Sequence, residues 1–332
     1  MRGKFHKLGQ FAWLAGLRLR RSLPQERFPR AFHIAYLGTP SFIVREYPSE
    51  WDPPTRKHER TKHERNSAPE VALRRFAVAT RVNPWPIVLP AVAGTAAGVA
   101  AWGAVHPSSQ LFGATLCRTP LRTQIALTFD DGPNPAITPR LLALLERRNV
   151  RATFFLVGQF ARACPELVRE IAARGHTIGN HSETHANLAL ASPHRVVEEL
   201  ARCQHSVAGA LDRGANGLPA WLRPPFGYRR PGLSNAARRA GLRGVVMWSL
   251  TAYDWKPQRP EQLIARLAPV AGRPARGPGG EIVLLHDGDF HQLGADRAHV
   301  IAALEHWLPR WHDGGFEFVT IDEVAGAMAG TA

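Results

Sequence analysis

The sequence predicts an α/β fold in its last two-thirds, built on a parallel sheet that is open or closed into a barrel. Two observations carry this prediction. From residue 118 onward, short apolar runs alternate with amphipathic helical patterns over about 210 residues, as expected of parallel strands joined by crossover helices. Polar motifs directly follow several of these runs, and active sites of parallel α/β folds lie at the carboxyl ends of their strands.

Seven apolar runs are expected to form strands: 125–129, 152–157, 177–179, 221–222, 244–248, 282–285 and 318–320. Helical patterns lie between them. One contains the leucines of 141–145 and precedes Arg147, a second covers 165–173 and ends before Gly175, and a third begins at Ser192-Pro193 and runs through Ala208. Proline at the first helical position and glycine after the last are the expected punctuation of such helices.

The first 81 residues differ in composition from the rest. They carry 17 Lys/Arg against 7 Asp/Glu, and so supply +10 of the formal net charge of +15. The stretch 48–69 is charged, rich in proline and almost free of aliphatic residues, which predicts a solvated, disordered segment. Because no methionine lies between Met1 and Met247, the alternative is that part of this segment is an over-called start of translation.

Nucleic acid is not the expected partner of the basic segment. The sequence has no zinc-finger spacing, no RNA-binding signature and no helix-turn-helix pattern, which are the features that usually accompany a basic nucleic-acid surface. The three cysteines have no C-x-x-C spacing either.

Residues 82–117 contain no Asp, Glu, Lys or Arg and form a candidate membrane anchor and linker. Within them, 87–105 (from Ile87 to Val105) would span ~28 Å as a helix, close to the ~30 Å of a bilayer core. The basic residues come before this run, so the positive-inside rule predicts a single-pass protein of the cytoplasmic membrane with the C-terminal domain outside. Pro90 and many Ala and Gly residues weaken this interpretation. A cleaved export signal and a buried soluble helix are the alternatives.

Two adjacent carboxylates follow the first strand of the domain. Asp130 and Asp131 precede Gly132-Pro133. Successive side chains on a strand point to opposite sides, so the two acids are expected to have different partners. A turn that only caps the strand is the alternative.

His181 and His185 come directly after another predicted strand. At this spacing they would meet on one face of a helical turn, and neutral imidazole is a common metal ligand. With Asp131 they complete three ligands and leave positions open for water, as a catalytic metal site requires. Ser182 and Glu183 are expected to face solvent or to support the ligands.

Three further motifs stand at predicted strand ends. Arg223-Pro-Pro-Phe-Gly-Tyr228 is a fixed turn that could aim a backbone N–H at a developing oxyanion, and its arginine could clamp a carboxylate. Asp254-Trp255 follows the 244–248 strand. His286 ends a fully apolar strand, where it is placed to donate a proton. Each motif taken alone could also be an ordinary turn or core residue.

Together the motifs TFDDGP, HSETH, RPPFGY, DW and LLH, in this order and spacing, resemble those of the polysaccharide deacetylases, carbohydrate esterase family 4. The resemblance covers roughly 118–324 and does not reach 1–81. It implies a distorted (β/α) barrel of about seven parallel strands, formed by a domain of residues 118–332. The implied activity is removal of N-acetyl groups from an N-acetylated polysaccharide of the envelope or the extracellular space.

The resemblance also implies a role for each matching residue. Asp131, His181 and His185 resemble the ligands of one divalent metal, usually Zn²⁺ and sometimes Co²⁺ or Ni²⁺. Asp130 resembles the general base and Arg223 the residue that orients it. The roles implied for the other matching residues are oxyanion donor (the Tyr228 backbone N–H), general acid (His286), tuning of that acid (Asp254), and substrate contacts in the groove and methyl pocket (Trp255, Leu284 and Pro225).

One departure from the family pattern is Thr251, where many members carry a second aspartate; we expect it to affect the groove and not the chemistry. Two alternative functions remain at this level: a small-amide or cyclic-imide hydrolase of the same fold, and an inactive membrane-anchored module that binds sugar. Neither the polymer nor the oligomeric state follows from the sequence.

Overall fold

This computed structural model describes residues 85–211, 218–272 and 279–329; the basic segment 1–81 therefore lies outside the described residues. The strands are β1 (Thr115–Leu116), β2 (Gln124–Gly132), β3 (Thr153–Leu156), β4 (Thr177–Asn180), β5 (Trp221–Leu222), β6 (Gly244–Val246), β7 (Leu250–Thr251), β8 (Glu281–His286) and β9 (Glu317–Phe318). The helices are α1 (Trp85–Val105), α2 (Thr138–Arg147), α3 (Gly158–Ala163), α4 (Pro165–Ala173), α5 (Pro193–Ala210), α6 (Leu233–Arg239), α7 (Pro260–Gly272), α8 (Ala298–Asp313) and α9 (Ile321–Ala329), with a 3₁₀ turn at Pro225–Gly227.

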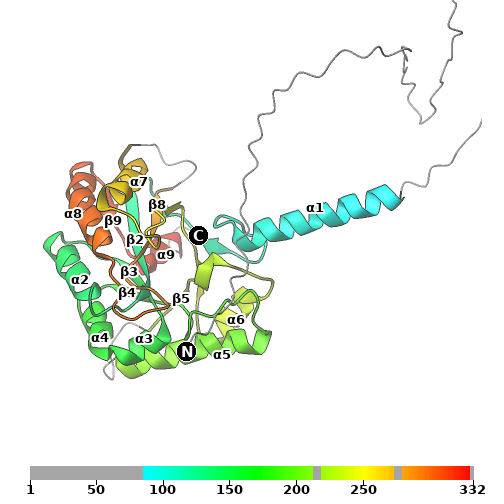
Figure 1. Cartoon of the computed structure of the whole chain (residues 1–332), viewed down its shortest axis with the longest axis horizontal. Helices are drawn as coiled ribbons and strands as arrows, with labels where there is room; N and C mark the ends of the chain where they lie inside the picture. Colours follow the sequence, from blue (N-terminus) through cyan, green and yellow to red (C-terminus); the bar gives the residue numbers. More distant parts are fainter. Residues whose placement is uncertain (1–84, 212–217, 273–278, 330–332) are drawn as a thin grey trace, which may run out of the picture. The chain divides into compact units, whose positions relative to one another are not determined.

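The strands form one parallel sheet in the order β1-β6-β5-β4-β3-β2-β8-β7, and β9 also pairs with β2 (Figure 1). Its two ends approach each other because β7 follows β6 after only three residues. The connecting segment bonds to both sides: the Met247 N–H donates to Leu116 of β1, and the Ser249 N–H donates to Ile282 of β8. The sheet is thus a distorted barrel, and the predicted fold class is confirmed.

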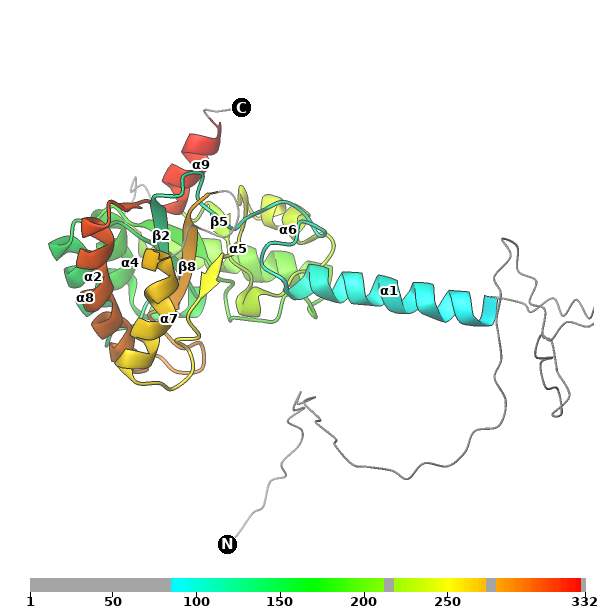
Figure 2. The same ribbon diagram turned by 90° about the horizontal axis from the view of Figure 1, so that it is seen from above.

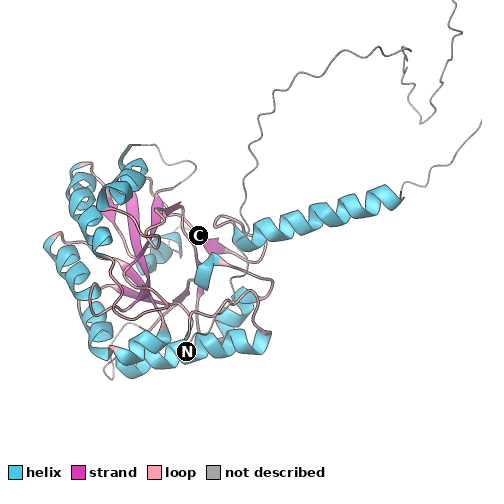
Figure 3. Cartoon of the chain, viewed as in Figure 1, coloured by secondary structure: helices cyan, strands magenta, loops and turns pink. Residues whose placement is uncertain are grey.

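The sequence pattern found seven of the strands described here, at somewhat different bounds. It missed β1 and β7, which are two residues long and, unlike the equally short β5 (Trp-Leu), combine a leucine with a threonine and form no apolar run. The predicted helices are confirmed as α2, α4 and α5, and the Ser192 hydroxyl caps α5 by accepting from the Arg195 N–H. Helices surround the strands (Figure 3), and α8 packs against both α2 and α7 on one flank of the barrel (Figure 2).

Side chains along β2 point alternately into the barrel and out towards the surrounding helices. Ile125, Leu127 and Phe129 pack in the cluster that includes the helix leucines. Ala126 instead packs with interior residues such as Phe155 and Ile282. Every second residue along a strand shares one face, so the side chains of Thr128 and Asp130 point inward like that of Ala126, near the carboxyl-terminal mouth of the barrel.

Helix α1 is apolar along its whole length and carries no charge. Its window Val88–Val105 has a mean hydropathy of 1.6, and 6% of that window is buried. Among the described residues it is the one helix long and apolar enough to cross a membrane. Its end is bonded to the barrel by Arg229, whose N–H donates to Ala104 O at 2.9 Å and whose guanidinium donates to Ser109 O at 2.5 Å and to His106 O.

Candidate active site

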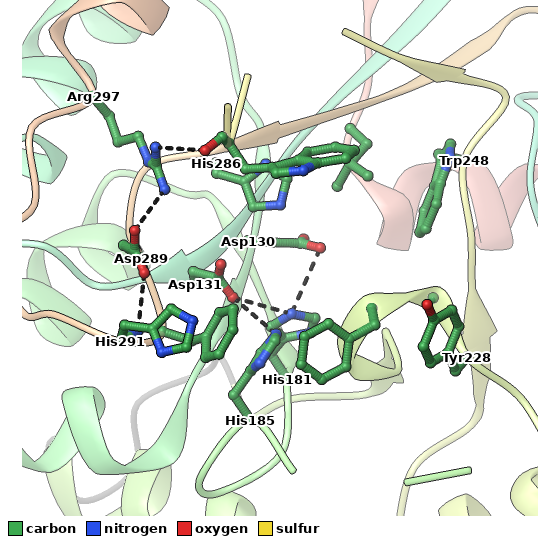
Figure 4. Close-up of a pocket in the computed structure, with 15 residues that line it drawn as sticks. Asp130, Asp131, His181, His185, Tyr228, Trp248, His286, Asp289, His291 and Arg297 are labelled. Atoms are coloured by element: carbon green, nitrogen blue, oxygen red, sulfur yellow. Dashed lines mark hydrogen bonds and ion pairs between the residues drawn. The ribbon is translucent and has the colours of Figure 1, made fainter. Parts of the chain in front are cut away.

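A pocket of about 460 Å³ lies at the carboxyl ends of the strands, and all five sequence motifs contribute to its lining (Figure 4). Its wall is made by Asp130 and Asp131 from β2, His181 and His185 after β4, Phe226 to Tyr228 after β5, Trp248 and Trp255 on either side of β7, and Leu284 and His286 from β8, together with residues of the loop that follows β8.

The two aspartates both face this pocket, although they are adjacent on one strand. The register of β2 against β3 shifts between Asp130 and Gly132, and Asp131 has a φ of 68°, in the left-handed region. This irregularity interrupts the alternation of side chains, so the expectation that they point to opposite sides is wrong. The two carboxylates do have different partners, as expected.

Asp130 is held by an arginine inside the barrel. Its Oδ1 accepts a hydrogen bond from Arg223 Nη1 at 2.9 Å, while its Oδ2 lies 3.8 Å from His181 Nε2. Arg223 is fully buried and is fixed from two other directions, because it donates to Thr128 Oγ1 and to Met247 O and stands over the Phe155 ring. One oxygen of Asp130 is therefore restrained and the other faces His181.

Asp131, His181 and His185 form a compact group in which one ligand atom from each lies within 4.8 Å of the others. Asp131 Oδ1 is 3.4 Å from His181 Nε2 and 3.2 Å from His185 Nε2. On its other side, His181 Nδ1 lies 2.8 Å from the Arg223 carbonyl oxygen. A carbonyl can only accept, so Nδ1 carries a proton and Nε2 faces Asp131. In the neutral ring Nε2 presents its lone pair there, and in the protonated ring it donates to the Asp131 carboxylate.

The electrostatics of this group fit a divalent cation. Burial alone would raise the pKa of Asp131, but the hydrogen bond from His181 and the charges of the nearby histidines outweigh it and lower that pKa, so the carboxylate is ionised. Burial, together with His181, lowers the pKa of His185 to about 3, so its imidazole is neutral. One carboxylate and two imidazole nitrogens converge in a buried place, which is a common ligand set for Zn²⁺.

The histidine motif does not form the helical turn that its spacing predicted. Residues 181–185 are a loop after β4, with left-handed φ values of 65° at Ser182 and 56° at His185. This loop brings the two imidazole centroids to 4.9 Å. Ser182 and Glu183 are fully buried, so the expectation of solvent-facing side chains is wrong, and support of the ligands is the alternative that remains.

His286 ends β8 next to a buried carboxylate. Asp254 Oδ1 is 2.9 Å from His286 Nδ1, and Asp254 Oδ2 accepts the His286 main-chain N–H at 2.6 Å. Burial alone would lower the pKa of His286, but the charge and hydrogen bond of Asp254, followed by the charges of Asp131 and Asp130, raise it to about 9. The imidazolium form therefore predominates at neutral pH and can donate a proton.

Aromatic side chains form much of the remaining wall. Trp255 is 37% exposed and meets the His286 ring edge-on at 5.3 Å, and Leu284 lies in the floor with 3% exposed. Sequence reasoning missed Trp248 and Phe290, although both line the pocket and Phe290 stacks on the His185 ring at 3.9 Å. An aromatic residue in an irregular segment has no periodic signal that would have identified it.

The turn after β5 meets only some of the expectations. The Tyr228 N–H donates to the Pro225 carbonyl at 3.2 Å and is therefore engaged within the turn; its role as an oxyanion donor stays a prediction. Pro225 is buried and does not line the pocket, whereas Phe226 and Tyr228 do. Thr251 pairs with Leu284 in the β7–β8 ladder and is also outside the lining.

Comparison with known proteins agrees with this geometry. The family model for polysaccharide deacetylase matches residues 118–245. A chitooligosaccharide deacetylase of Bradyrhizobium sp. (strain ANU 289) is 33% identical over 201 residues, which are 58% of this chain and 86% of the relative. The chain belongs to the polysaccharide deacetylase family. The resemblance drawn from the motifs is thus confirmed, and so is the enzyme class.

Two further comparisons with the polysaccharide deacetylase family cover a similar share of the chain. A peptidoglycan-N-acetylglucosamine deacetylase of Bacillus cereus is 33% identical over 207 residues, 60% of this chain and 87% of the relative. The crystal structure of the Bc1960 peptidoglycan N-acetylglucosamine deacetylase superposes with a TM-score of 0.53 at 28% identity, covering 63% of this chain and 91% of that one.

Proposed function

We propose that this chain removes the N-acetyl group from N-acetylglucosamine-type residues of an envelope or extracellular polysaccharide, with one divalent metal held by Asp131, His181 and His185. The observation that carries the proposal is that this group shares one pocket with Asp130 and His286. Each of these two is held by a buried partner of opposite charge, Arg223 for Asp130 and Asp254 for His286. Family members similar to the chain act on chitooligosaccharides or peptidoglycan, as their names state.

The metal is most readily Zn²⁺, with Co²⁺ or Ni²⁺ as alternatives, since two imidazoles and one carboxylate suit all three ions. When bound, a divalent cation would lower the pKa of a water molecule towards neutrality and polarise the acetamide carbonyl. His181 contributes Nε2 because its Nδ1 faces the Arg223 carbonyl.

The proton transfers fall to Asp130 and His286. Arg223 restrains one oxygen of Asp130 and leaves the other to accept a proton from the attacking water. His286, protonated at neutral pH because of Asp254, donates a proton to the leaving nitrogen as the C–N bond breaks. The water thus adds to the carbonyl carbon, and the products are acetate and a free amine on the sugar.

We assign substrate contacts to the aromatic rim and the floor of the pocket. Trp255 and Tyr228 are 37% and 40% exposed at the rim, where their faces can stack on pyranose rings. Leu284 offers an apolar contact for the acetyl methyl group in the floor of the pocket. Hydrogen bonding to the oxyanion by the Tyr228 N–H would require release of its 3.2 Å bond to Pro225.

We also propose that residues 118–332 are the catalytic domain and that 82–117 anchor it to the outer face of the cytoplasmic membrane, with 1–81 as a basic cytoplasmic segment. The apolar and almost wholly exposed helix α1 supports this, as do the basic residues that precede it. A cleaved export signal would place the domain on the same side of the membrane.

Acetate release by the purified full-length chain tests the activity and its substrate together. The substrates compared are N-acetylglucosamine oligomers, peptidoglycan, an N-acetylated exopolysaccharide, and a small amide and a cyclic imide. Hydrolysis of the imide opens its ring without releasing acetate, so it is followed by loss of the imide itself. We expect acetate from at least one polymer and no turnover of the small compounds. Preferred hydrolysis of the imide would favour the small-amide alternative, and polymer binding without acetate release would favour an inactive sugar-binding module.

A further inference from the structure

The loop that carries the two ligand histidines needs external support. Ser182 and His185 both adopt left-handed φ values, which Cβ sterics disfavour for residues other than glycine. Such backbone persists only where its surroundings hold it. The supporting contacts should therefore be visible on the side of the loop that faces away from the pocket.

Glu199, on α5, holds the loop next to His185. Its Oε2 accepts the Thr184 main-chain N–H at 2.9 Å, and both of its oxygens lie within 3.1 Å of the Thr184 hydroxyl. Glu199 is 0% exposed. Its charge is balanced by Arg195, one turn earlier on the same helix, whose Nη2 lies 2.5 Å from Glu199 Oε1.

Glu183 holds the middle of the loop in the same way. Its side chain is 0% exposed and points away from the pocket, where Oε2 accepts from Ser206 Oγ at 2.9 Å and Oε1 is paired with Arg162. A Cβ at Gly158 would lie 2.0 Å from Oε2, so glycine at that position leaves room for the carboxylate. The main chain adds two bonds of 3.0 Å, from the N–H groups of Gly158 and Gln159 to the carbonyls of Ser182 and Glu183.

Neither carboxylate has a part in the proposed chemistry, yet both are buried, which is costly for a charged group unless it is paired and hydrogen-bonded. We propose that Glu183 and Glu199 are positioning residues for the Asp131–His181–His185 group: by fixing the loop between the two histidines, they set the affinity of that group for its metal. This inference rests on the proposed metal function. Groups that orient metal ligands are typically worth roughly 10- to 100-fold in metal affinity.

The test compares two neighbouring glutamates of α5 in the full-length protein. Glu199→Gln keeps the size of the side chain but removes its charge and one acceptor. Glu198→Gln removes the charge of a surface residue that pairs with the same Arg195. After dialysis against a chelator, the dissociation constant for Zn²⁺ is measured by competition with a chromophoric chelator, with circular dichroism as a check of folding.

We expect Glu199→Gln to raise the Zn²⁺ dissociation constant roughly 10- to 100-fold, and Glu198→Gln to leave it unchanged. Acetate release at saturating Zn²⁺ should be retained, since the ligands and proton-transfer groups are intact. A merely structural role would lower thermal stability and leave the dissociation constant of the folded protein at its wild-type value, and that result would overturn the inference.

If Glu199→Gln does not fold, the test uses Thr184→Val, which removes only the hydroxyl bond to Glu199. A Zn²⁺ dissociation constant that is raised in Thr184→Val and returns to the wild-type value in Thr184→Ser supports the inference. An unchanged dissociation constant in Thr184→Val refutes it. If the wild-type chain itself binds no Zn²⁺, Co²⁺ or Ni²⁺, the proposed metal function fails. Wild-type binding that Glu199→Gln leaves unaltered defeats the positioning role alone.

Discussion

The pair formed by His286 and Asp254 makes a quantitative prediction. The pKa of His286 lies at about 9 against an ordinary value of 6.5, which corresponds to roughly 3 kcal/mol in favour of the protonated ring. Burial opposes this rise, and the carboxylate of Asp254 is its largest source. Asp254→Asn should therefore bring the pKa of His286 to 6.5 or below.

The sign of the pH dependence follows from the role of His286 as an acid. In the wild type the protonated ring is lost as the pH rises through about 9, or somewhat lower when a cation next to Asp131 offsets the charge of that carboxylate. In Asp254→Asn the protonated form of His286 is lost near pH 6.5, so that only about a tenth of the rings are protonated at pH 7.5. Because His286 acts in its protonated form, kcat/KM at that pH should fall at least roughly tenfold. The stability of the fold has the same pH dependence. The raised pKa of His286 contributes its full stabilisation below pH 6.5, and this contribution is lost as the pH rises to about 9.

The assay is acetate release between pH 5 and 10 at saturating metal, with kcat/KM fitted to its alkaline limb. Asp313→Asn, an exposed carboxylate in the last turn of α8, serves as the control and should follow the wild-type profile. An alkaline limb at the same pH in Asp254→Asn and in the wild type would refute the assignment of His286 as the acid tuned by Asp254.

Three further predictions concern the base, its partner and the membrane. Asp130→Asn should keep stoichiometric metal and lose turnover, whereas Asp131→Asn should lose the metal itself; metal analysis with the opposite result would exchange the two roles. Arg223→Lys keeps the charge but not the three-directional contacts, so kcat should fall roughly 10- to 100-fold with metal content unchanged; wild-type kcat would contradict its role in orienting the base. Alkaline phosphatase fused after Ser109 should be active and a cytoplasmic reporter silent, and the reverse pattern would rule out an external catalytic domain.

The sequence predicted the fold class well because its signals are local. Parallel strands buried on both faces read as apolar runs, and the helices between them carry proline, serine and glycine where α4 and α5 begin and end. The two strands it missed, β1 and β7, are each two residues long and exist because neighbouring strands pair with them. Such pairing is a tertiary effect that no local pattern encodes.

The candidate site residues could be named from motifs, but their geometry could not. Periodicity predicted a helical turn at His181 and opposite directions for Asp130 and Asp131, and left-handed backbone at Ser182 and Asp131 overrode both. Phe290 and Glu199 escaped notice for a related reason. Phe290 stacks on His185 and Glu199 bonds to the neighbouring Thr184, each from another element, and only the folded chain brings them there.

Titration of the chelator-treated full-length protein with Zn²⁺, with acetate release from the polymer substrate followed at each addition, tests the central claim most directly. A single group of one aspartate and two histidines predicts negligible activity without metal and a linear rise that stops at one equivalent. Full activity in the metal-free protein, or a rise that continues to two equivalents, would contradict a mechanism built on one divalent ion.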